Sequence, residues 1–225
     1  MSGPATVPRR LGVVTIGQTP RPDLHAVFAA AAPGVDVAVD GALDTCGPGE
    51  LTALATDGPY PLLVRLADGS TREVPRDRLV PYVVQAAGRL AAGGATLVVL
   101  ACAGEFPALA CPVPVVVPGR VVPAALRRLA EGRRLGIVTP NAAQRPFADA
   151  KWRADGFAVS VTHAAPGRPA ELAAAAARLR DAAAELVLLD CMGHDEASRA
   201  AMANLSGLPT LAVQGLVADL AGALV

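Results

Sequence analysis

The chain has 225 residues, of which 52% are hydrophobic and 3% aromatic, and its 20 basic and 20 acidic side chains give a formal net charge of zero. A neutral chain with few aromatic rings lacks the basic, stacking surface of a nucleic-acid-binding protein, and four cysteines are too few for a disulfide scaffold. No apolar run is long enough to cross a membrane and no apolar leader precedes the first arginine pair, so we expect a cytoplasmic protein without nucleic-acid or membrane partners.

Short β-branched runs alternate with stretches rich in Ala, Leu and Arg, a pattern typical of βαβ units on a parallel sheet. Strands are expected at residues 11–16, 35–39, 96–101, 113–117, 135–139, 157–162, 186–190 and 210–213. Helices are expected at residues 23–32, 76–92, 123–131, 142–154, 169–184, 195–205 and 216–224. Residues 62–74 differ from this pattern and predict an inserted β-hairpin with its turn at Asp68-Gly69.

Two segments of the chain occur twice and in the same order. RLGVVT at 10–15 returns as RLGIVT at 134–139, and LVVLACAG at 97–104 returns as LVLLDCMG at 186–193. This repeat predicts an α/β fold with two pseudo-symmetric halves, mostly parallel sheets and a β-hairpin insertion in the first half. We expect the first half to comprise residues 1–118 and 208–225, with the hairpin at about 62–74, and the second to comprise 119–207. The halves are expected to share one crevice.

Ligands bind beyond the carboxyl ends of the strands in open parallel sheets. The four strand ends in the repeated segments therefore predict one shared site, with glycines that let backbone N–H groups approach a ligand and helix N-termini that favour an anion. A small carboxylate suits such a site. The residues expected to bind it are Thr15, Gly17, Gln18, Ala103, Gly104, Thr139, Pro140, Asn141, Met192, Gly193 and His194.

Cys102 and Cys191 occupy equivalent positions at two of these strand ends. Two opposed thiols suit proton transfer, in which one thiolate takes a proton from carbon and the other thiol returns one, provided that helix N-termini lower the thiol pKa. Each cysteine taken alone could also be a small buried side chain with a structural role only. A further hypothesis is that the two thiols form a redox pair. Cys46 and Cys111 have no counterparts and are interpreted as structural. His194 fits either a substrate contact or a helix cap.

Neither a metal nor a cofactor is expected. Cys191 and His194 are two ligands at most, fewer than a zinc site needs. The chain has no GxxxxGK[ST] loop, and residues 12–17 do not complete the dinucleotide motif GxGxxG.

Three segments, TIGQTPRPD at 15–23, CAGEFP at 102–107 and LDCMG at 189–193, resemble the AroM family over essentially the whole chain. That family is similar in turn to the aspartate/glutamate racemase superfamily. The resemblance implies two pseudo-symmetric α/β halves, no cofactor, and catalysis by one cysteine from each half, at positions matched here by Cys102 and Cys191. The superfamily commonly has Asn-Thr after the first cysteine and Thr after the second. Here Ala103-Gly104 and Met192 stand there.

We therefore expect an AroM-like, cofactor-independent racemase, isomerase or related lyase that acts on a small carboxylate by acid/base transfer between two cysteines. The alternative is a non-catalytic regulatory protein that binds a small molecule on the same scaffold, because fold does not determine function. The Ala-rich helices are compatible with a homodimer.

Overall fold

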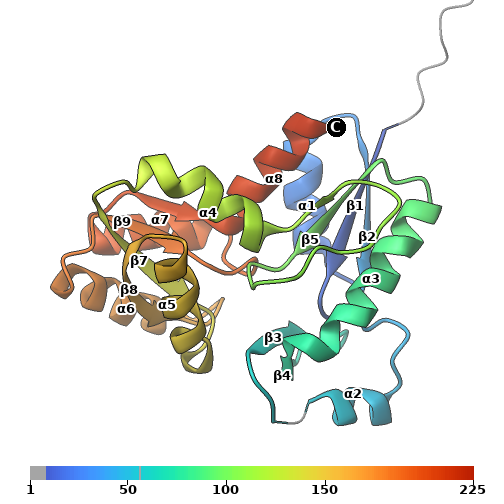
Figure 1. Cartoon of the computed structure of the whole chain (residues 1–225), viewed down its shortest axis with the longest axis horizontal. Coiled ribbons are helices and arrows are strands. Elements are labelled where there is room, and N and C mark those ends of the chain that lie inside the picture. Colours follow the sequence, from blue (N-terminus) through green and yellow to red (C-terminus); the bar gives the residue numbers. More distant parts are fainter. Residues whose placement is uncertain (1–8, 56) are drawn as a thin grey trace, which may run out of the picture.

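The computed structural model describes residues 9–55 and 57–225. In this part the chain forms two lobes, each built on a four-stranded parallel sheet, together with one antiparallel hairpin (Figure 1). The expected α/β class with mostly parallel sheets and an inserted hairpin is confirmed. Residues 1–8, in which we expected no leader, lie outside the described residues.

The two sheets have the same strand order once the repeat is taken into account. The first lobe has the order β2-β1-β5-β6 and the second has β8-β7-β9-β10, so the repeated segments β1 and β7 hold equivalent central places. The strands of the first lobe are β1 (Arg10–Thr15), β2 (Asp36–Gly41), β5 (Leu97–Ala101) and β6 (Val115–Val116). Those of the second are β7 (Arg134–Thr139), β8 (Ala158–His163), β9 (Leu186–Leu189) and β10 (Thr210–Ala212).

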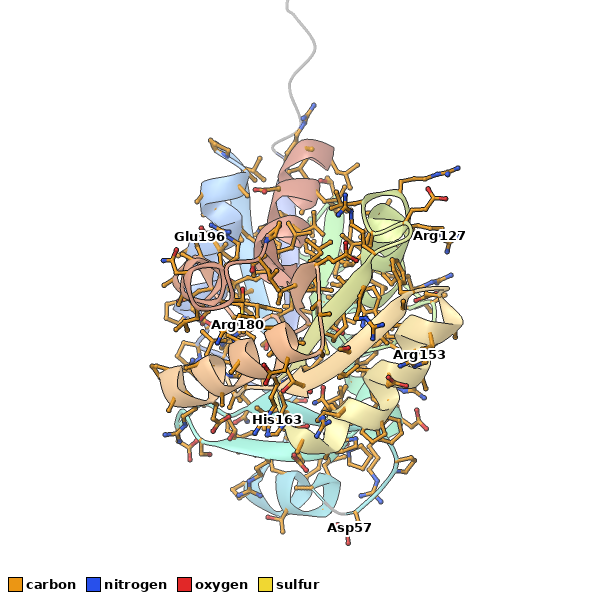
Figure 2. All side chains as sticks on the ribbon, turned by 90° about the vertical axis from the view of Figure 1, so that its left-hand side faces the viewer. Asp57, Arg127, Arg153, His163, Arg180 and Glu196 are labelled. Atoms are coloured by element: carbon orange, nitrogen blue, oxygen red, sulfur yellow. The ribbon has the colours of Figure 1, made fainter. Side chains whose placement is uncertain are left out.

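Helices cover the sheets, so β5 and β9 are buried along their whole length, as their continuous apolar sequences predict. Helix α3 buries Leu79, Val83, Ala86 and Leu90, a spacing that puts one apolar stripe against the first sheet. Charged side chains such as Arg153 and Arg180 lie on the outer surface of the second lobe (Figure 2). The main helices are α1 (Pro22–Ala31), α3 (Arg76–Ala92), α4 (Pro118–Leu129), α5 (Arg145–Ala154), α6 (Pro169–Asp181), α7 (Glu196–Ser206) and α8 (Val213–Leu224).

Three helical segments differ from the expectation. Helix α4 begins at Pro118 rather than at Pro123, where the helix was expected to begin. Proline is favoured at the first position of a helix, which fits Pro118, and Pro123 is accommodated inside the helix. The expected helix 142–154 divides into a 3-10 turn, η1 (Ala142–Gln144), and α5, which has Pro146 in its first turn. Helix α2 (Pro48–Leu54) was not expected, because the Gly47-Pro48-Gly49 segment at its start is more typical of a loop.

Residues 208–225, expected in the first half, divide between the lobes. Strand β10 pairs with β9 in the second sheet, whereas α8 packs against α1 of the first lobe. The contact is close, since a Cβ atom on Gly222 would lie 2.0 Å from the Ala31 carbonyl oxygen. One apolar core accordingly runs through both lobes and includes Leu11, Ile137 and Val217.

The hairpin consists of β3 (Pro61–Arg65) and β4 (Thr71–Pro75). Gly69 has φ +82°, a conformation that glycine adopts without strain in the turn. The hairpin also contacts the second lobe, because the Asn141 amide donates a hydrogen bond to Glu73 at 2.6 Å. The Tyr60 ring, just before β3, meets Phe147 edge-on at 4.9 Å between centroids. The inserted hairpin thus bridges the two lobes.

Among residues 9–55 and 57–225, no helix combines the length and apolar character required to cross a membrane.

Candidate functional site

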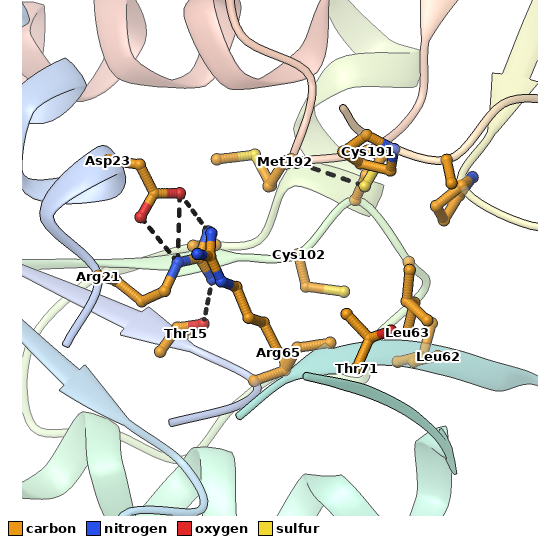
Figure 3. A pocket seen from close by; sticks show the side chains of 18 of the residues that line it. Thr15, Arg21, Asp23, Leu62, Leu63, Arg65, Thr71, Cys102, Cys191 and Met192 are labelled. Atoms are coloured by element: carbon orange, nitrogen blue, oxygen red, sulfur yellow. Dashed lines mark hydrogen bonds and ion pairs between the residues drawn. The ribbon is translucent and has the colours of Figure 1, made fainter. Parts of the chain in front are cut away.

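A cavity of about 520 Å³ lies where the lobes and the hairpin meet. The ends of β1, β5, β7 and β9 open into it, as the strand-end argument predicts. Figure 3 shows Arg21 and Asp23 at one end and the hairpin residues Leu62, Leu63 and Thr71 at the other. The lining residues include Thr15, Ile16, Arg21, Asp23, Leu62, Leu63, Arg65, Gly69, Ser70, Thr71, Ala101, Cys102, Ala103, Gly104, Pro140, Gln144, Ala165, Pro166, Arg168, Asp190, Cys191, Met192 and Gly193.

Both cysteines of the repeat face this cavity from different lobes (Figure 3). Cys102 directly follows β5 and is buried, while Cys191 lies just beyond β9 and is half-buried. The backbone N–H of Gly193 donates to the Cys191 sulfur at 3.3 Å. The duplicated strand ends therefore bring two thiols to one cavity.

Burial raises the pKa of the Cys102 thiol to about 12 and that of Cys191 to about 11. Backbone N–H groups two residues further on, at Gly104 and Gly193, act in the opposite direction but do not outweigh the loss of hydration. The expectation that helix N-termini lower these pKa values is thus wrong, because burial outweighs them. Both thiols are protonated at neutral pH, and a thiolate formed here is a strong base.

Arg21 forms a fixed ion pair at one end of the cavity. Its guanidinium contacts both carboxylate oxygens of Asp23, with a shortest distance of 2.7 Å, and donates to the Thr15 hydroxyl at 3.0 Å. Burial acts to raise the pKa of Asp23, but the hydrogen bonds and charge of Arg21 leave that pKa below its usual value. Arg21 is therefore already engaged with Asp23 and Thr15.

Arg65 and Arg168 also line the cavity, one from the hairpin and one from the second lobe. Both are exposed, and within the described residues neither guanidinium has a hydrogen-bond or ion-pair partner. Two such cations in the cavity lining favour an anionic ligand, since guanidinium groups bind carboxylates with paired hydrogen bonds.

Several residues expected at the site do line the cavity, although their part in binding remains a prediction. They are Thr15, Cys102, Ala103, Gly104, Pro140, Cys191, Met192 and Gly193. Sequence reasoning missed most of the polar lining, above all Asp23, Arg65, Arg168 and Asp190. The predicted hairpin was the available signal for Arg65, because an insertion next to a site commonly supplies one of its walls.

Other residues expected at the site are absent from the cavity lining and have structural partners. The Gln18 amide joins Leu43 O to Ala67 N and so fastens the hairpin to the first lobe. The Thr139 hydroxyl donates to the Asn141 and Thr162 carbonyls, and Asn141 caps η1 through Gln144 N.

Gly17 and His194 also lie outside the lining. The backbone of Gly17 packs against Arg65. Nε2 of the buried His194 lies 3.1 Å from Ala164 O. Within residues 9–55 and 57–225, no three His, Cys, Asp or Glu side chains are grouped as metal ligands.

Comparison with known proteins identifies both a family and a fold. The AroM protein family matches residues 11–225. Arylmalonate decarboxylase superimposes with a TM-score of 0.58 at 17% identity, covering 95% of this chain and 88% of its own. Glutamate racemase from Aquifex pyrophilus gives 0.60 at 13%, covering 96% and 84%. Maleate isomerase from Pseudomonas putida S16 gives 0.54 at 14%, covering 94% and 89%. No curated protein matches the sequence.

Proposed function

The chain belongs to the AroM family, and we propose that it is a cofactor-independent racemase, isomerase or related lyase for a small carboxylate. The observation that carries the proposal is the pair Cys102 and Cys191, which come from equivalent strand ends of a duplicated fold and line one cavity from different lobes. The two groups would act as an opposed acid and base.

The chemistry needs one thiolate and one thiol. The sulfur that is ionised takes the proton from the carbon next to the carboxylate, and the electron pair of the broken C–H bond passes into the carboxylate as an enediolate. The opposing S–H then gives its proton to the other face of that carbon, so the charge moves from one sulfur to the other. A weakly acidic C–H bond requires a strong base, and a thiolate whose pKa is raised is such a base. The same raised pKa values mean that only a small fraction of each cysteine is ionised at neutral pH.

The polar lining supports a carboxylate as the ligand. Arg65 and Arg168 offer guanidinium groups that have no partner among residues 9–55 and 57–225, and the backbone at Gly104 lies beside the Cys102 sulfur as that at Gly193 lies beside Cys191. Backbone N–H groups and the two arginines would then take the place of the Asn and Thr side chains that are missing after the cysteines. The arylmalonate, glutamate and maleate in the names of the similar structures are also small carboxylic acids.

A non-catalytic regulatory protein that binds a small carboxylate is the second candidate. It is favoured by the apolar residues Ala103 and Met192 next to the thiols, and by the raised pKa values that keep both thiols protonated at neutral pH. Such a protein would gain thermal stability from a carboxylate without turning it over.

The test is a proton NMR screen in D₂O with a panel of amino acids, malonates and unsaturated dicarboxylates. A substrate of the proposed enzyme exchanges its carbon-bound hydrogen for deuterium, isomerises or loses CO₂. Cys102→Ser and Cys191→Ser should each lower that rate by at least about 100-fold, the usual range for loss of an acid or base. Cys111→Ser, outside the cavity lining, is the matched control and should keep the rate. Full turnover in either cavity variant, or stabilisation by ligand without any reaction, would contradict the proposal.

A further inference from the structure

Lys151 is the only lysine in the chain, and it is buried with 6% of its surface exposed. It comes from α5 of the second lobe, yet its Nζ donates to the carbonyl oxygen of Ala103 in the first lobe at 3.2 Å. The same Nζ lies 3.8 Å from Oδ2 of Asp190 and 4.8 Å from the centre of the Trp152 ring. One ammonium group thus contacts the residue after Cys102 and the residue before Cys191.

Asp190 is held as firmly as the lysine. Its Oδ2 accepts a hydrogen bond from Trp152 Nε1 at 2.9 Å, and the exposed fractions of the Lys151 and Asp190 side chains are 3% and 8%. A buried ion pair of this kind contributes little net stability, because both charges lose their hydration. Stability alone therefore does not account for placing the only lysine between the two thiol loops.

We propose that Lys151 is a positioning residue that joins the two cysteine loops across the lobe boundary and supplies the positive charge that stabilises a Cys102 thiolate. It contacts Ala103 and Asp190 and does not line the cavity itself. The inference rests on the proposed thiol site, but it concerns ionisation of the thiol rather than turnover of any substrate.

The charges around Cys102 agree with this role. Burial is the main cause of its raised pKa; Cys191 and Asp190 raise it further, and Lys151 lowers it. Tyr60 also interacts with Cys102, and burial raises the pKa of that phenol as well. Around Cys191, burial and Asp190 raise the pKa while Arg21 of the first lobe lowers it. Each thiol therefore receives its stabilising cation from the opposite lobe.

Loss of Lys151 should have opposite effects on the reactivity of the Cys102 thiol, depending on whether the lysine acts by its charge or only supports the fold. If Lys151 only supports the fold, its loss loosens the loops, lets water reach Cys102 and speeds alkylation. If its charge matters, Lys151→Met raises the pKa of Cys102 by about 1 pH unit and cuts the thiolate fraction about tenfold. A more basic thiolate is also a better nucleophile, so we expect a net threefold or greater slowing.

The experiment measures iodoacetamide labelling of Cys102 at pH 7 to 9.5, with Cys191 and Cys111 followed on the same peptide maps. Lys151→Met should slow Cys102 at least threefold, and Asp190→Asn, which removes a negative charge, should speed it. The control is Arg153→Met, which removes an exposed cation two residues away on the same helix (Figure 2). It should leave the labelling rates of Cys102 and Cys191 unchanged.

Lys151→Met leaves the buried carboxylate of Asp190 unpaired, so the substitution is also made together with Asp190→Asn. The double variant should be labelled at Cys102 at least threefold more slowly than the Asp190→Asn single variant. Faster or unchanged labelling of Cys102 after loss of the lysine would overturn the inference. Labelling does not depend on turnover. If the labelling rates of Cys102 change as expected but no compound reacts in the NMR screen, the result would therefore count against the proposed function alone.

Discussion

Substitution of Gly17 by alanine should displace the hairpin wall of the cavity. Gly17 lies two residues beyond the end of β1, and a Cβ atom added there would lie 2.0 Å from the carbonyl oxygen of Arg65 in β3. The next backbone N–H, that of Gln18, donates to the same oxygen at 2.9 Å. The obstacle is backbone rather than a flexible side chain, so the hairpin has to move.

The size of the effect follows from this geometry. Relief of the contact requires a displacement of about 1 Å, and overpacking of this kind costs about 1–3 kcal/mol. Weakening the hydrogen bond from Gln18 adds about 1 kcal/mol. The free energy of unfolding should therefore fall by about 2–4 kcal/mol, which for a chain of 225 residues lowers the melting temperature by about 5–15 °C.

Thermal unfolding followed by circular dichroism tests this reasoning. The matched control is Gly88→Ala in the middle of α3, where nothing lies within 4 Å of an added Cβ and alanine favours the helix by up to about 1 kcal/mol. The control should keep or raise the melting temperature. A Gly17→Ala protein that melts at the wild-type temperature would refute the claim that the strand end and the hairpin are in tight backbone contact.

Two further predictions concern buried polar groups. Trp152→Phe removes the donor to Asp190 and leaves a small cavity, so urea titration should show a loss of about 2–4 kcal/mol; an unchanged midpoint would contradict the buried network. Burial holds the pKa of His194 below its usual 6.5, so the unfolded chain binds the proton first and wild-type stability should decline as the pH falls below 6.5. The fall in the urea midpoint between pH 7.5 and pH 5.5 should therefore be smaller in His194→Gln than in the wild type. An equal fall in the two proteins would count against a buried neutral imidazole.

The architecture could be predicted because duplication leaves its trace in buried strands. RLGVVT and RLGIVT became the central strands β1 and β7, whose neighbours are equivalent in the two sheets. A buried parallel strand admits few residue types, so the two copies stayed recognisable. The same constraint places the ends of β5 and β9, and with them Cys102 and Cys191, at one crevice.

The polar lining of the site was less predictable. Polar residues after a strand can bind a ligand or fasten a loop, and the course of the loop decides between the two. Gln18 fastens the hairpin and Asn141 caps a turn, whereas Arg65 reaches the cavity from an insertion. The contact between Lys151 and Ala103 joins residues 48 positions apart in different lobes, so no local pattern signals it.

In the proposed enzyme, one carboxylate binds between the thiols of Cys102 and Cys191. Crystal structures of the protein soaked separately with malonate, maleate and glutamate test it most directly. We expect the acid in the cavity, its carboxylate against backbone N–H groups or arginine, and both sulfurs within about 4 Å of one ligand carbon, as proton transfer requires. Acid bound only outside the cavity, or sulfurs of Cys102 and Cys191 more than about 8 Å apart around it, would show that the two thiols do not act on one carbon.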